Sequence, residues 1–244
     1  MSLYQIPMTL LLALLGPGVF WAFWQMLGTV WQNNTLALCL LFGTFIGAII
    51  DHYVARKLPF FRVYEHEFTH GLVALLFLRE IKDFKVTFSR GGHVSFTDGF
   101  GGQFGNMVII LAPYVLPTVT CILVIVRACL SQPLPWFDVL IGMSLGFHTC
   151  STIAETRTNW SRTWWHLPKT LRKTDIEQVL PWFALIYIPV VTVAIHGLLL
   201  GVLGQGMTGL TRWVSAIWYP TLQVSQAIGL TAGLNSIFAR ITNL

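Results

Sequence analysis

Residues 66–78 read HEFTHGLVALLFL, so a His-Glu-x-x-His motif runs directly into a stretch of apolar residues. Two histidines four residues apart on a helix lie on one face, where both imidazoles can reach a single zinc ion. The glutamate beside the first histidine can then act as general base toward water at the metal. A polar ligand cluster beside so apolar a stretch is costly unless it has a function. The motif therefore predicts a zinc site, with His66 and His70 as ligands and Glu67 as the catalytic base.

The composition indicates a membrane protein. Of the 244 residues, 55% are hydrophobic and only 10% are charged, whereas a soluble domain carries about 25% charged residues. The net charge of +5 is interpreted as membrane-topology charge, because no pattern of basic residues interleaved with exposed aromatics points to nucleic acid. The four cysteines stand singly, without a C-x-x-C pair, so neither a disulfide framework nor a cysteine zinc site is indicated.

Apolar stretches of spanning length predict an all-α polytopic fold in the lipid bilayer. Six transmembrane helices are expected, at about residues 4–29, 35–54, 106–128, 136–154, 175–201 and 210–234. Pro220 and several polar residues interrupt the last. The helix that carries HEFTH, over about residues 63–80, has an apolar part shorter than the roughly 20 residues of a full crossing. We therefore expect it to be partly inserted, within a single integral membrane domain over residues 1–244.

The segment after this helix changes character. Residues 84–88 and 93–96 alternate apolar and polar side chains, and Ser89-Arg90-Gly91-Gly92 separates them. This pattern predicts a membrane-associated β-hairpin. The glycine-rich join at residues 99–105 lacks a preceding Rossmann-type strand, so it predicts tight backbone packing rather than a dinucleotide loop.

Basic residues predict the orientation in the membrane. Thirteen of the fifteen lysines and arginines fall on one side if the HEFTH helix and the hairpin do not fully cross. Cytoplasmic loops carry an excess of these residues. We expect the candidate site to face the cytoplasm, with both termini on that side.

A catalytic zinc ion commonly takes three protein ligands and keeps one position open. Asp175 is the leading candidate for the third ligand because it stands where a basic loop meets a long apolar stretch. It is equally suited to capping a helix N-terminus. Glu155 and His148, seven residues apart on one helix face, are alternatives as ligands or as hydrogen-bonding partners of the motif histidines. Glu65 is expected to face solvent.

Together these features resemble the site-2 protease family of intramembrane zinc metalloproteases, the M50 family, and most closely its compact bacterial M50B-type branch. The resemblance covers roughly residues 60–180. It rests on HEFTH, the hairpin turn at residues 90–94, the Gly-Gly-Gln-Phe-Gly stretch at residues 101–105 and a downstream aspartate. It implies a zinc ion held by His66, His70 and Asp175, with Glu67 as base. It also implies a bacterial inner-membrane location.

The function expected from the motif and the resemblance is cleavage of transmembrane segments of single-span or other membrane-protein substrates. The main alternative is a non-catalytic, metal-binding scaffold that serves as a subunit of a larger membrane complex. A transporter that uses the His, Glu and Asp residues as an ion path is a third class. It would need paired broken helices in two related halves, which the sequence does not contain.

Overall fold

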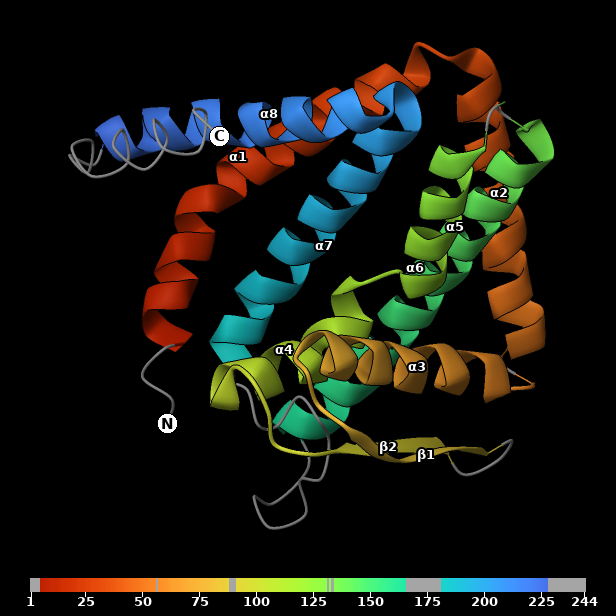
Figure 1. The fold of residues 1–244 in the computed structure, drawn as a ribbon, viewed down its shortest axis with the longest axis vertical. Helices are drawn as coiled ribbons and strands as arrows, with labels where there is room; N and C mark the ends of the chain where they lie inside the picture. Colours follow the sequence, from red (N-terminus) through yellow and green to blue (C-terminus); the bar gives the residue numbers. More distant parts are fainter. Residues whose placement is uncertain are drawn as a thin grey trace.

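The computed structural model describes residues 5–55, 57–87, 91–130, 132, 134–165 and 181–227. Side chains are described over the same ranges except for residues 158–165 and 181–182. The elements run in the order α1 (Gln5–Trp31), α2 (Asn34–Ile50), a π-helical turn η1 (Asp51–Ala55), α3 (Phe60–Leu76), β1 (Ile81–Thr87), β2 (Gly91–Phe96), α4 (Gly102–Val115), α5 (Thr118–Cys129), α6 (Pro135–Trp165), α7 (Pro181–Gln205) and α8 (Met207–Ala227). The fold is therefore mostly helical, with one small hairpin (Figure 1).

The apolar helices confirm a polytopic membrane fold but give fewer crossings than the six expected. Within the described ranges, four segments are long and apolar enough to cross a membrane: α1, α2 with η1, α6 and α7. The pair α4 and α5 would add a fifth as one bent span. The predicted last span, at about residues 210–234, is not among these segments over its described part, since α8 contains Pro220 and many polar residues.

The single helix expected at about residues 106–128 is two helices bent by 79°. Leu116 is extended, with φ −104° and ψ 106°, as expected for a residue that precedes a proline. Pro117 follows it and has no N–H to continue the helical hydrogen bonding. The break gives α4 and α5 different directions, so that α4 lies across the bundle while α5 runs along α6 (Figure 1).

The HEFTH helix, α3, also lies across one end of the long helices (Figure 1). Its 17 residues extend for about 25 Å, which is short of the roughly 30 Å hydrocarbon core. The helix ends at Leu76, earlier than the expected residue 80. Arg62 holds α3 to the end of α2 through a bidentate pair with Asp51, at 2.7 and 2.6 Å.

Glycines bring the backbones of α2 and α6 into direct contact. Gly43 and Gly47 lie on α2, four residues apart, and Gly142 and Gly146 have the same spacing on α6. A Cβ atom at any of the four would overlap a carbonyl oxygen of the opposite helix. This reciprocal close approach is typical of helix pairs in membranes. It holds α6, which carries His148 and Glu155, against α2. Because Arg62 and Asp51 join α3 to the end of α2, α6 is also held near α3.

The predicted hairpin is present, and the glycine-rich join behind it is tightly packed. β1 and β2 are antiparallel, with Phe84 opposite Val94 and Lys85 opposite His93. Gly101 has φ 84° and Gly102 has φ 50°, values that favour glycine. The buried Arg79 guanidinium donates to Asn106 and to the carbonyl of Gly102. These contacts attach the hairpin to the start of α4.

Candidate metal centre

His66 and His70 converge on one point beside α3. Their Nε2 atoms lie 3.1 Å apart. Two nitrogens bound to one tetrahedral zinc ion at about 2.0–2.1 Å are separated by about 3.3 Å. The pair therefore fits two corners of a zinc site, and the expected convergence of the two imidazoles occurs.

The outer nitrogen of each imidazole is fixed by a partner on another helix. His70 Nδ1 lies 2.7 Å from the carbonyl oxygen of Ile109 on α4, to which it donates. His66 Nδ1 lies 2.9 Å from Glu155 Oε2 on α6. A proton on each Nδ1 leaves the Nε2 lone pairs directed at the shared point. Such outer hydrogen bonds are usual for histidines that bind a metal, and here the partners come from helices that are distant in the sequence.

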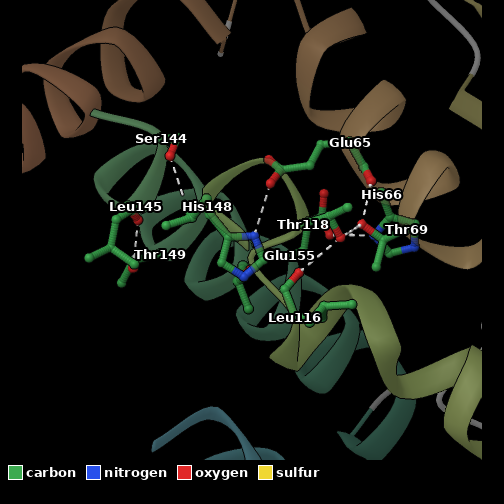
Figure 2. A network of polar contacts seen from close by, with 12 residues as sticks. Glu65, His66, Thr69, Leu116, Thr118, Ser144, Leu145, His148, Thr149 and Glu155 are labelled. Carbon is green, nitrogen blue, oxygen red and sulfur yellow. Dashed lines mark hydrogen bonds and ion pairs between the residues drawn. The ribbon is translucent and has the colours of Figure 1, made fainter. Parts of the chain in front are cut away.

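The buried face of α3 contacts the ends of α4 and α5 beside the histidine pair. Thr69, between the two histidines, bonds to the carbonyl of Glu65 at 2.8 Å and to the hydroxyl of Thr118 at 2.7 Å (Figure 2). Thr118 begins α5, directly after the break from α4. The ring of Tyr114, near the end of α4, contacts the His66 ring edge-on, with 5.6 Å between the two ring centroids. The bend between α4 and α5 therefore brings both helices to the histidine pair.

The side chain of Glu67, on α3, contacts the hairpin. A Cβ atom added at Gly92 of β2 would lie 2.8 Å from Glu67 Oε1 and 2.7 Å from a methyl group of Val63. Only glycine at position 92 leaves room for this carboxylate. The candidate base and the second strand are therefore in contact, which the sequence spacing alone did not indicate.

Glu65 does not face solvent, and that expectation was wrong. Its side chain is buried and its carboxylate lies 3.2 Å from His148 Nδ1 on α6 (Figure 2). A cue was present in the sequence, since Glu65 stands four residues before Thr69 and eight before Val73, on the buried face of α3. His148, one of the alternatives for the third ligand, is thus engaged with Glu65 rather than with the histidine pair.

The third ligand remains a prediction. Asp175 lies outside the described residues. Among those that the structure does describe, no third His, Cys, Asp or Glu joins the pair to form a metal-holding group. Glu155, the other alternative, contacts the outer nitrogen of His66, not the Nε2 atom that faces His70. Its position matches that of a hydrogen-bonding partner of a ligand.

A cavity of about 750 Å³ lies beside the centre, between α6 and α7. Its wall includes Tyr114, His148 and His196. The ring centroids of His148 and His196 are 6.5 Å apart. The remaining wall is largely apolar, with Phe23 and Ile188 among its residues. Because Tyr114 also contacts His66, the cavity and the histidine pair share a wall.

A family comparison agrees with this arrangement. The model of the Peptidase M50B-like family matches residues 37–152. Residues 37–152 belong to that family. The M50B-like segment runs from α2 to α6 and includes HEFTH and the hairpin, but it ends before Glu155 and Asp175. M50 peptidases are in general zinc metallopeptidases, so the match points to a membrane metalloprotease. Searches of curated proteins and of solved structures returned no significant match to this chain.

Proposed function

We propose that this protein is an intramembrane zinc metalloprotease that cleaves transmembrane segments of other membrane proteins. The observation that carries the proposal is the separation of 3.1 Å between the Nε2 atoms of His66 and His70. The opposite nitrogens face Glu155 and Ile109, an arrangement that would direct both Nε2 lone pairs at a shared metal ion. The family match and the apolar helices around the pair support the same reading.

The protein supplies the ligands and an environment for them. His66 and His70 would hold the zinc ion together with Asp175, whose carboxylate would offset part of its charge in an apolar setting. When bound, the ion would polarise the scissile carbonyl and make water a stronger nucleophile near neutral pH. Glu155 and the Ile109 carbonyl keep the two imidazoles oriented through their Nδ1 atoms.

Glu67 would act as the general base. It would take a proton from the attacking water and later pass this proton to the leaving amine. Glu67 is the neighbour of His66 on α3. Its carboxylate lies against Gly92 of β2. A catalytic carboxylate next to a strand is suitably placed for a substrate that has been drawn out into an extended form.

The hairpin would hold that extended substrate. A transmembrane helix has to unwind before its backbone can be attacked, and pairing with a free strand edge satisfies the exposed backbone groups. β2 pairs with β1 on one edge, and no other described strand pairs with it. The contact between Gly92 and Glu67 brings this strand next to the proposed base.

We also propose that the site faces the cytoplasm, in a bacterial inner membrane. Lys82 and Lys85 lie on β1, and Lys57 precedes α3. These cations belong to the same end of the molecule as the histidine pair. The positive-inside rule assigns such an end to the cytoplasmic side.

The proposal is tested by metal content and cleavage measured on the same purified full-length protein. His66→Ala and His70→Ala should each lose zinc and cleavage of a panel of tagged single-span membrane proteins. His52→Ala, which removes an exposed histidine from η1, is the matched control and should keep both. Wild-type protein that binds no zinc, or cleavage that survives removal of zinc by a chelator, would refute the proposal.

A further inference from the structure

A second cavity lies at the other end of the bundle, far from the histidine pair. Its volume is about 620 Å³, and two helical stripes form its walls. One stripe follows α1 through Trp21 and Gln25 to Gln32, just beyond the end of the helix. The other stripe follows α8 through Arg212 and Tyr219. No acidic residue is in the wall.

The location of this cavity is fixed by the ends of two candidate spans. α1 ends at Trp31 and α7 at Gln205, and a Cβ atom at Gly204 would lie 2.7 Å from the hydroxyl of Thr29. These ends therefore lie side by side, at the depth where a bilayer passes from hydrocarbon to headgroups. Phe137 of α6 packs in the same cluster as Val30 and Leu203. Glu155 is 18 residues further along α6, about 27 Å away, so the cavity lies at the opposite membrane face from the histidine pair.

The polar groups of the cavity suit an anion that also carries hydrogen-bond donors. Arg212 is exposed to the cavity and forms no hydrogen bond or ion pair with the described residues. A guanidinium group binds phosphate oxygens in a bidentate manner. The side-chain oxygen of Gln205 is buried without a hydrogen-bond partner in the described part of the chain. This oxygen needs a donor, such as a hydroxyl group.

We propose that this cavity binds the headgroup of an anionic phospholipid of the phosphatidylglycerol type. The phosphate would pair with Arg212, and a glycerol hydroxyl would donate to Gln205. Trp21 and Tyr219 are half or more exposed in its wall. An ethanolamine or choline headgroup would bring a cation into a cavity that has an arginine and no carboxylate in its wall. This inference does not depend on proteolysis.

Gly28 offers a way to close the cavity without disturbing the fold. It lies in the wall on α1, and a Cβ atom there would meet no other atom within 4 Å. Gly28→Leu should therefore fill the headgroup space while leaving the helix packing intact. Gly28→Ala is its matched control, because one methyl group leaves most of the space open. Lys57→Gln, which removes an exposed cation outside the cavity, is the matched control for Arg212→Gln.

The test is native mass spectrometry of the detergent-purified full chain, titrated separately with phosphatidylglycerol, phosphatidylethanolamine, phosphatidylcholine, inorganic phosphate and glycerol phosphate. Phosphatidylglycerol should bind about tenfold more tightly than the two zwitterionic lipids, because the cation of an ethanolamine or choline headgroup would be repelled by Arg212 in a wall without a carboxylate. Arg212→Gln and Gly28→Leu should each remove this preference, whereas Lys57→Gln and Gly28→Ala should keep it.

Three results would overturn the assignment. Equal affinity of wild type for all three lipids would remove the headgroup site. A preference that persists in both Arg212→Gln and Gly28→Leu would place any lipid site elsewhere. Inorganic phosphate or glycerol phosphate that binds as tightly as phosphatidylglycerol would identify a site for soluble phosphates instead of a lipid.

Discussion

At the scale of single residues, the hydrogen-bond partner of each Nδ1 atom determines whether the Nε2 atom of the same histidine can bind a metal. Glu155 faces His66 Nδ1 at 2.9 Å and the Ile109 carbonyl faces His70 Nδ1 at 2.7 Å. The motif made the histidine pair predictable, because its spacing is a local property of a helix. The roles of Glu155 and of Glu65 depend on α6, whose His148 is 83 residues from Glu65. A contact between residues so far apart in the sequence cannot be predicted from spacing. The position of Glu65 on the same helix face as Thr69 and Val73 does, however, indicate that its side chain is buried.

The first prediction separates the third ligand from the outer partner of His66. Asp175→Ala should lose bound zinc, because two imidazoles alone leave the ion short of a ligand and of compensating charge. Glu155→Gln should keep zinc but bind it about 10–100-fold more weakly, as expected when the partner of a ligand is altered. Zinc affinity is measured by competition with a calibrated chelator.

Glu80→Gln, which changes an exposed carboxylate near the end of α3, is the control and should match the wild type. If Asp175→Ala binds zinc normally while Glu155→Gln releases it, Glu155 is the third ligand. Asp175 would then only cap its helix.

At the scale of elements, apolar length predicted the spans, whereas their bends and contacts came from packing. The stretch at residues 106–128 was apolar throughout, but the chain turns by 79° after Leu116. Pro117 made a break possible, yet prolines within membrane helices often cause only a kink, so the size of the bend was not predictable. The hairpin was predictable from its alternation and turn residues. The G-x-x-x-G spacings at residues 43–47 and 142–146 are a sequence signal for the close packing of α2 against α6.

The second prediction concerns that helix pair. Gly47→Leu should lower the melting temperature of the detergent-purified protein by several degrees, since the added side chain would force the backbones of α2 and α6 apart. Gly28→Ala, at a position with no neighbouring atom within 4 Å, should leave the melting temperature unchanged or slightly raised. Equal melting temperatures for Gly47→Leu and the wild type would show that the two helices do not depend on this close approach.

The third prediction concerns the hairpin as a substrate edge. Val94→Pro should reduce cleavage strongly while sparing zinc content, because proline removes a backbone donor from β2. Val94→Ala keeps that donor and loses only side-chain contacts, so it should cleave far better than the proline variant. Should both variants cleave at the wild-type rate, β2 is a plain structural hairpin.

At the scale of the whole molecule, α3, α4 and the hairpin lie together across one end of the long helices (Figure 1). The histidine pair belongs to this layer, and the cavity beside it extends between α6 and α7. On the proposed function, water would approach this layer from one membrane face and a substrate segment from within the bilayer. The cavity lined by Arg212 belongs to the other end.

The fourth prediction fixes the orientation of that layer. In a background without the four native cysteines, Lys85→Cys should be protected from a membrane-impermeant reagent outside intact cells. Thr208→Cys, at the exposed start of α8, should be labelled. Both positions should react after the membrane is opened. Labelling of residue 85 from outside would mean that the layer with the histidine pair faces away from the cytoplasm.

The central claim, that Glu67 activates water at a metal held by His66 and His70, is tested most directly by Glu67→Gln. Zinc content and the cleavage rate of a tagged single-span substrate are measured on the same purified full-length protein. Zinc content should stay unchanged and the cleavage rate should fall by at least about 100-fold, because glutamine keeps the shape of the side chain but cannot accept the proton. Wild-type cleavage by a Glu67→Gln protein that retains its zinc would contradict this claim.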